Sequence, residues 1–564
     1  MEFLGLHYAI WLVLALYFAG MLVLGWLCKR GIKNPESYLL GNRRFGVSMM
    51  IMHAFGAGTN PSDTTGTISK TVSAGASGIW VSWMWMFGTP FYWIIAPVIR
   101  RMRCLTMADY FRERFSNSAA VLYTFTSGAA MTIFFGAVLL GTTRTVQGMM
   151  GERFIATGEE FDWWFYGVLF VTTITFMLYG YWGGIIAAVR TDMVQGLMII
   201  ILSILAIGPV LKMEAVGGLS GMRRTLSGAA ENAEYLNLFS SQGGFSVWRV
   251  ILLCISAPLT ALALPHLISV CGAGRSEWEG RMGFTYGNML KRICTIGWSI
   301  LGLCWLAYLI KTGSKINPDA AFGDCIRSVL PAAAQGLMLA CVMAAAMSSG
   351  DAVQVTVAGL FTQSIYRPYF NPDADEQTQI RITRMAGVLI ILASLWFAII
   401  AQRSFVESIV AYFRILSFIG IAVALGIVWR RMNTGGVFGC VVPAVAVYVF
   451  IHFNQQKAVV LIPAYLADVL PLVTGLAGGI LGSLSTPAPE KRVIEKFFTK
   501  IYVPVGQEEK LALSLDEAVP PAKRLITAGG LFILKPSRQS WVGIVVATGI
   551  CAACVAVMLA LLKY

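Results

Sequence analysis

The stretch GAGTNP at residues 56–61 interrupts an apolar segment that covers residues 45–70. Glycine and proline both weaken the hydrogen-bonding ladder of a helix, which leaves backbone carbonyl and amide groups without helical partners. Inside a lipid bilayer such groups are tolerated only where neighbouring protein, water or a bound ion satisfies them. If the segment lies in a membrane, the interruption therefore predicts a broken helix whose free oxygens line a functional site.

The composition of the whole chain is that of a membrane protein. Of its 564 residues, 57% are hydrophobic and 13% are charged, whereas an ordinary soluble domain has about 25% charged residues. A bilayer core takes about 20 apolar residues per helix, so the chain is predicted to be an all-α polytopic protein with about 14 transmembrane helices. These lie near residues 9–28, 45–70, 77–99, 119–148, 163–184, 192–212, 247–270, 285–310, 331–364, 383–402, 405–429, 436–453, 460–485 and 541–562.

The distribution of charged residues also indicates a membrane protein. Lysine and arginine number 43 against 29 acidic residues, a net charge of +14, and the excess falls in alternate loops such as 29–44, 100–114 and 486–540. Lysine and arginine accumulate in cytoplasmic loops during membrane insertion. We therefore expect a multi-pass protein of the plasma (inner) membrane, in contact with the lipid bilayer and with no nucleic-acid partner. The sequence makes no prediction of oligomeric state.

A second interruption lies five predicted spans after the first, at Pro258 and at the LPH stretch of residues 264–266. Because five is an odd number, a repeat of five spans would be inverted across the membrane. Residues 45–215 and 247–430 are thus predicted to form a five-plus-five inverted-repeat core with a broken first helix in each repeat; two unrelated packing kinks are the alternative. The remaining segments are an extra transmembrane helix and cytoplasmic loop (1–44), two peripheral helices (436–485), a cytoplasmic loop with an interfacial helix (486–540) and a final helix (541–564).

A later span carries Ser348 and Ser349 one turn after Ala345. Hydroxyl and free carbonyl oxygens are hard donors that suit a small hard cation. Opposite the carbonyls of Gly56 and Thr59, these groups could enclose one Na⁺. Taken alone, the small residues around the serines indicate only close helix packing.

Two acidic residues, Asp192 and Asp351, adjoin apolar runs. An acidic group inside a membrane is a functional candidate by default. If the two carboxylates face each other, their repulsion favours a cation or a proton between them, which predicts a second cation or proton site. Alternatively, Asp192 pairs with Arg190 and Asp351 contacts water. Eleven cysteines and four histidines form no recognisable metal-ligand cluster along the sequence.

Arg144 and Arg414 lie within otherwise apolar spans, where a charge costs about 2.5 to 3.5 kcal/mol on insertion scales. The planar fork of arginine suits a carboxylate, so the partner of each could be an anionic solute or an internal acid such as Glu407. Polar and aromatic side chains near the two breaks would suit a polar solute. These further candidates are Asn60, Asp63, Thr64, Trp83 and His266.

Taken together, several stretches make the chain resemble the sodium/solute symporter family, which includes sodium/glucose, sodium/galactose, sodium/proline and sialic acid transporters. They are YLLGNR at residues 38–43, the polar stretch 106–115, the stretch 183–195 and the serine pair. The resemblance implies a sodium site made of two backbone carbonyls at the first break with a carbonyl and two hydroxyls of the later helix. Those positions are Gly56, Thr59, Ala345, Ser348 and Ser349.

The chain also departs from the family pattern. Relatives with a second sodium site use an acid that matches Asp192 together with hydroxyls, where this chain has Asp351 and Ala352. A second Na⁺, a proton-sensitive pair and no second site are all compatible with this change. In the first break, Gly58 and Asn60 stand where proline-type relatives have an acid and a serine.

The solute positions favour an acidic ligand over a sugar. Arg144 lies about where acid-recognising members have a substrate-binding arginine, and the dipeptide at 265–266 replaces the amides usual in sugar-transporting members. We predict a sodium-coupled secondary active symporter that imports a small polar solute, with a carboxylate favoured, and that needs only Na⁺ as a cofactor. A proton-coupled or uncoupled carrier and a non-transporting membrane sensor are the alternatives. No catalytic constellation is found, so an enzyme is not expected.

Overall fold

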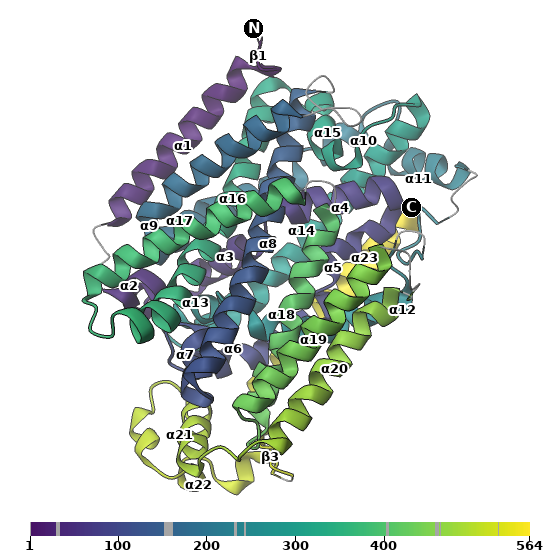
Figure 1. Ribbon diagram of the computed structural model, residues 1–564. Coiled ribbons are helices and arrows are strands. Elements are labelled where there is room, and N and C mark those ends of the chain that lie inside the picture. The colour runs from purple at the N-terminus through teal and green to yellow at the C-terminus, as the bar shows by residue number, and fades with distance from the viewer. Residues whose placement is uncertain are drawn as a thin grey trace.

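A computed structural model describes residues 2–29, 34–151, 162–229, 234–241, 244–401, 405–456, 462, 464–527 and 529–563. Most of these residues are helical (Figure 1). Within the described ranges, nine helices are long and apolar enough to cross a membrane, and four shorter apolar helices accompany them. The prediction of an all-helical polytopic membrane protein is confirmed, whereas the count of 14 spans stays a prediction.

The first broken helix consists of α3 (Val47–Gly58) and α4 (Pro61–Ala74). The residue before a proline is disfavoured in the helical conformation, and Thr59 and Asn60 are accordingly extended. Pro61 then starts α4 at a position where its missing N–H costs nothing. The Asn60 side chain accepts the Ser62 backbone N–H at 2.9 Å and caps the new helix.

The rest of the first half is a chain of helices around this break. They are η2 (Gly75–Ile79), α5 (Trp80–Trp83), η3 (Met86–Phe91), α6 (Tyr92–Arg101), α7 (Met107–Arg114), α8 (Asn117–Met150), α9 (Trp163–Ile204), α10 (Ile207–Leu211) and α11 (Gly218–Gly228). The boundary expected between the spans 163–184 and 192–212 stays a prediction, and helix α9, of 42 residues, runs across it. It contains no proline, and a helical glycine costs only about 1 kcal/mol.

The second half opens with another broken helix, α12 (Val247–Ala263) and α13 (Leu267–Gly272), separated at residues 264–266 as expected. A broken helix therefore begins each half of the core. The helices that follow are α14 (Glu277–Thr312), η5 (Pro318–Ala320), α15 (Ala321–Val329), α16 (Ala332–Phe361), the π-helix η6 (Thr362–Phe370), α17 (Glu376–Ile400) and α18 (Phe405–Val428).

The described residues outside these halves form the periphery. They comprise β1 (Glu2–Phe3), β2 (Leu6–His7), α1 (Tyr8–Lys29), α2 (Pro35–Leu40), η1 (Gly41–Arg43), α19 (Thr434–Gln456), α20 (Ala464–Ser485), α21 (Lys491–Tyr502), η7 (Glu508–Ala512), α22 (Leu515–Ala518), η8 (Pro521–Lys523), β3 (Arg524–Ile526), β4 (Ile533–Leu534) and α23 (Arg538–Lys563). Strand β1 pairs with β2 and β3 with β4, both antiparallel. The segment boundaries expected from the sequence stay predictions.

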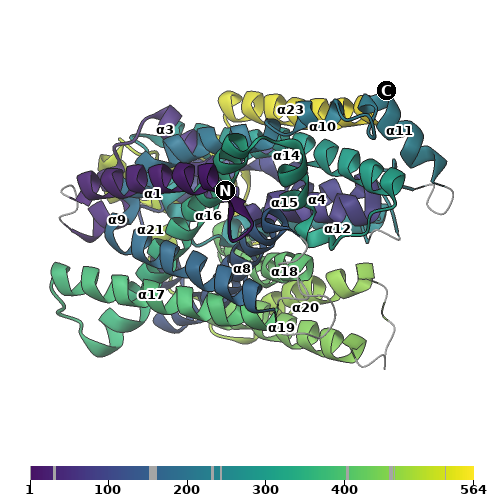
Figure 2. The same cartoon turned by 90° about the horizontal axis from the view of Figure 1, so that it is seen from above.

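Helix α16 lies at the centre of the molecule. In its most apolar 18-residue stretch 94% is buried, whereas the corresponding share for α23 is 22%. Seen from above, α23 lies at one edge and α17, α19 and α20 lie toward the other, with α16 and α8 between them (Figure 2). Helix α3 packs directly along α14. A side-chain carbon on Gly287 of α14 would lie 2.7 Å from the Ile51 carbonyl oxygen of α3, so glycine lets the two backbones touch.

Helix α21 lies at the end of the molecule opposite the N-terminus (Figure 1), on the side predicted to be cytoplasmic. Its apolar face, including Phe497, Phe498 and Ile501, is buried, and the helix contacts α6 and α7. The Phe497 ring lies 5.6 Å from the Tyr110 ring, between centroids. The expected apolar spacing thus serves to dock this segment on α6 and α7.

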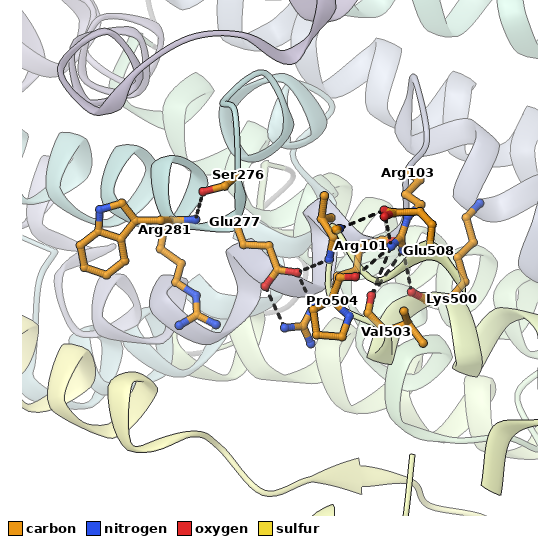
Figure 3. A network of polar contacts seen from close by, with 12 residues as sticks. Arg101, Arg103, Ser276, Glu277, Arg281, Lys500, Val503, Pro504 and Glu508 are labelled. Carbon is orange, nitrogen blue, oxygen red and sulfur yellow. Dashed lines mark hydrogen bonds and ion pairs between the residues drawn. The ribbon is translucent and has the colours of Figure 1, made fainter. Parts of the chain in front are cut away.

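Two arginines hold the segment around and after α21 in place (Figure 3). Arg103, just after α6, donates to the carbonyl oxygens of Lys500 at 3.1 Å and Pro504 at 3.2 Å. It also pairs with Glu508 at 3.1 Å, and the Gly506 amide and the Arg103 guanidinium lower the pKa of that carboxyl.

The neighbouring Arg101 donates two hydrogen bonds, of 2.7 and 2.8 Å, to the carboxylate of Glu277, the first residue of α14. The same carboxylate accepts the Val505 backbone N–H at 2.9 Å. The two arginines therefore join the end of α6, the start of α14 and the chain after α21.

Arg103→Ala should loosen the segment after α21 without disturbing the membrane core. It removes hydrogen bonds from a charged donor, each worth about 1.5 to 3 kcal/mol, so a Lys-specific protease should cleave after Lys510 at least about tenfold faster, since cleavage tracks the open population. Arg492→Ala is the matched control, because Arg492 is exposed on α21. Equal cleavage rates in the two variants would contradict this role.

Candidate functional site

The end of α3 and the middle of α16 bring oxygen atoms together at the first break. The Ser349 hydroxyl lies 3.5 Å from the Gly56 carbonyl oxygen, 3.4 Å from that of Ala57 and 3.5 Å from that of Thr59. Ser349 is completely buried. Three carbonyl oxygens at the first break therefore lie within 3.5 Å of one hydroxyl oxygen of α16, and we call these four oxygens the oxygen cluster.

The chemistry of this cluster suits a small hard cation. Its donors are carbonyl and hydroxyl oxygens, with no sulfur or nitrogen among them. Among the described residues, the buried Thr59 hydroxyl has no hydrogen-bond partner, so one more oxygen close to the break is uncommitted. Ala345, the remaining expected member, is buried one turn earlier on α16.

Ser348, next to the cluster, points to a different partner. Its hydroxyl donates to the Asp192 carboxylate of α9. The approach depends on Gly56, because a side-chain carbon there would lie 2.5 Å from the Ser348 hydroxyl oxygen. Asp192 is fully buried and is bonded by Ser348 and by His53. The side chain of Asp351 lies outside the described part of the structure.

His53 belongs to this site but was not among the residues predicted from the sequence. Its Nδ1 lies 2.6 Å from the Asp192 carboxylate, and both side chains are 1% exposed. The available signal was its position, because His53 precedes Gly56 by one helical turn on an apolar helix that ends in the break. No second histidine or cysteine lies at metal-ligand spacing from it in the sequence.

A cavity lies beside the oxygen cluster and touches both broken helices. Three of the expected solute-binding residues, Asn60, Asp63 and His266, line it, and Trp85 provides an aromatic wall. The cavity residues Ala57 and Gly58 belong to the same turn of α3 as the cluster carbonyls. Any group bound in the cavity would therefore share this turn with an ion in the cluster.

Two cations of α14 also line this cavity, Lys291 and Arg292. The Lys291 ammonium lies 2.7 Å from the Asp63 carboxylate and 2.6 Å from the Gly58 carbonyl oxygen. Arg292 donates to the Ser82 carbonyl oxygen at 2.8 Å. With two cations and one carboxylate, the wall carries an excess of positive charge.

The sequence contained a signal for this pair. Adjacent lysine and arginine residues inside a predicted span are costly in a membrane, just as lone arginines are. Lys291 and Arg292 should have been candidates on the same argument as Arg144.

Four expected solute-binding residues lie outside the cavity lining. Arg144 donates to the Gln147 amide oxygen at 2.8 Å and pairs with Asp162 at 3.7 Å. Arg414 pairs with Asp468 and not with Glu407. Each arginine thus has an internal acid, which satisfies its charge without a solute.

The other two are Trp83 and Thr64. The Trp83 indole donates to the Arg292 carbonyl oxygen at 3.0 Å, so it packs behind the cavity wall. Thr64 is buried within α4, one residue after Asp63.

Known proteins are similar to this chain over most of its length. A chain of a solved Na⁺-coupled sialic acid symporter, in a substrate-bound outward-open state, superposes with a TM-score of 0.70 at 17% identity, covering 86% of this chain and 99% of that one. The osmoregulated proline transporter of Bacillus subtilis is 25% identical over 85% of this chain and 95% of its own. The sodium/proline symporter of Salmonella typhimurium is 22% identical over 85% and 94%.

A model of one protein family matches residues 38–442, which include both broken helices and the serine pair. The chain is a multi-pass integral membrane protein, and it belongs to the sodium:solute symporter family.

Proposed function

We propose that this protein couples the entry of Na⁺ to the import of a small carboxylate-bearing solute by alternating access. The observation that carries the proposal is the contact of Ser349 with three carbonyls at the first break, next to a cavity lined by Lys291 and Arg292. The similar proteins transport proline and sialic acid, and both of these solutes contain a carboxylate.

The proposed Na⁺ ligands are the carbonyl oxygens of Gly56, Thr59 and Ala345 and the hydroxyls of Ser348 and Ser349. An ion held between them would pull the end of α3 toward α16. Because Gly58 and Asn60 of the same break line the cavity, the bound ion would also fix the shape of the solute site. This shared break is the physical basis we propose for coupling.

The membrane potential supplies the driving force. At −100 mV, each Na⁺ that crosses the full potential contributes about 2.3 kcal/mol, which corresponds to a roughly 50-fold accumulation of solute before any concentration gradient is counted.

The proposed solute partner is the ammonium of Lys291. An ammonium has three N–H donors, of which the Gly58 carbonyl and Asp63 use two. The third can donate to a solute carboxylate, and the nearby Arg292 adds positive charge that Asp63 alone does not balance. Asn60 and His266 are proposed to contact the polar remainder of the solute, and Trp85 its apolar part.

A proton-coupled carrier is the second candidate, because Asp192 and His53 form a buried pair beside the ion cluster. The two readings differ in their ion requirement. Replacing Na⁺ with K⁺ at constant pH should abolish solute accumulation in proteoliposomes under the sodium proposal and leave it intact under the proton proposal.

Ser348→Ala combined with Ser349→Ala should raise the Na⁺ concentration for half-maximal uptake by at least about tenfold, since two ligand oxygens are lost without added bulk. Uptake of labelled proline or another accepted carboxylate into proteoliposomes at graded Na⁺ measures this. Ser127→Ala is the control, because that buried serine donates to the Tyr123 carbonyl of its own helix at 2.6 Å. An unchanged Na⁺ dependence in the double variant would refute the ligand assignment.

Lys291→Met combined with Asp63→Asn should raise the KM for a carboxylate solute by about tenfold or more, while the KM for its neutral amide changes little. Removing both partners avoids a buried, uncompensated charge. Arg144→Lys provides the comparison, because Arg144 already has Asp162 as a partner and lies outside the cavity lining. If Arg144→Lys impairs carboxylate uptake and the double variant does not, the solute carboxylate binds at Arg144 instead.

A further inference from the structure

His53 forms the first link of a buried chain of three side chains from three helices. Its Nδ1 lies 2.6 Å from one oxygen of Asp192, and the other oxygen accepts the Ser348 hydroxyl. His53 belongs to α3, Asp192 to α9 and Ser348 to α16. All three are at most 1% exposed, so water does not compete for these bonds.

The position of the imidazole proton follows from the surroundings of the ring. Within the described residues, the buried Nε2 of His53 has no hydrogen-bond partner. A proton on Nε2 would therefore be buried without an acceptor, which costs about 1 to 3 kcal/mol. We accordingly assign a proton to Nδ1, which donates to Asp192.

The hydrogen bond from His53 determines which oxygen of Asp192 faces the Ser348 hydroxyl. With one oxygen held by His53, the carboxylate presents its other oxygen to the Ser348 hydroxyl. A serine hydroxyl has one proton and two lone pairs, so a proton that is directed to Asp192 leaves the lone pairs free for a cation. Histidine and carboxylate partners behind a metal ligand orient it in the same way in many metal sites.

The packing places the Asp192 carboxylate close to the first break. A side-chain carbon on Gly56 would lie 3.2 Å from the Asp192 oxygen that faces Ser348. The carboxylate thus lies directly against the turn that supplies the cluster carbonyls. A rotation of Asp192 would alter both the Ser348 hydroxyl and the charge beside the cluster.

We propose that His53 is a positioning residue for the ion site, which sets the affinity for Na⁺ and the preference for Na⁺ over Li⁺ by orienting Asp192 and, through it, Ser348. The proposal rests on the proposed sodium-coupled function and deepens it. His53 does not touch the ion; its effect passes through the two side chains that follow it.

Replacing His53 with different amides tests the direction of this bond. The asparagine amide can place an N–H near the position of Nδ1, whereas the glutamine amide places it near Nε2. We expect His53→Ala and His53→Gln to raise the Na⁺ concentration for half-maximal uptake by about tenfold or more and to change the Li⁺ to Na⁺ activity ratio. His53→Asn should stay within about threefold of the parent, a difference below 1 kcal/mol at 1.4 kcal/mol per tenfold.

Two further readouts separate positioning from a structural role. Na⁺-induced thermal stabilisation of the purified protein, measured without solute, should need correspondingly more Na⁺ in the alanine and glutamine variants. The solute KM at saturating Na⁺ should remain within about twofold in all of them. His452→Ala is the control, since that exposed histidine of α19 lies outside the chain of three side chains.

The possible failures are distinguishable. If uptake by the parent protein is the same in Na⁺ and K⁺, the proposed sodium coupling is wrong. If the parent requires Na⁺ but the alanine, glutamine and asparagine variants all need the same Na⁺ concentration for half-maximal uptake, only the proposed role of His53 is wrong. If the alanine variant does not fold, the contrast between asparagine and glutamine still decides the question.

Discussion

The structure depends on one interruption of a membrane helix and on the hydroxyl that meets it. Asn60 leaves the helical conformation because a proline follows it, and Thr59 before it is extended as well. The carbonyls at the end of α3 then face Ser349 within 3.5 Å. In a bilayer, free backbone oxygens need a partner. The small residues of α16 let that partner approach, and the absence of a side chain at Gly56 makes room for the adjacent Ser348 hydroxyl.

The buried charges follow a second constraint, which is that each needs an opposite charge or several polar partners. Arg414 has Asp468, Arg144 has Asp162, and Lys291 has Asp63. The first two pairs lie apart from the cavity, whereas the third lines it beside Arg292. This third group lines the cavity that both broken helices share, and it connects the solute site to the same break that forms the ion cluster.

Local chemistry made much of the fold predictable. Glycine and proline marked both breaks, apolar runs marked most of the helices, and the serine pair one turn after Ala345 indicated the oxygen cluster. The continuous α9 was not predicted, because two apolar runs joined by glycines look the same whether or not a helix passes between them. The pairing of the buried charged groups could not be predicted either, since Lys291 and Asp63 are separated by 228 positions in the sequence and His53 and Asp192 by 139. A sequence indicates that a buried charge needs a partner, but only tertiary packing selects it.

The central claim is that the oxygen cluster binds Na⁺ directly. Scintillation proximity binding of ²²Na⁺ to the purified protein, without solute or a membrane potential, tests this claim most directly. The account predicts saturable binding that unlabelled Na⁺ displaces and K⁺ does not, and that is lost when both serines are replaced by alanine. Binding that K⁺ displaces equally well, or that persists without the two hydroxyls, would contradict it.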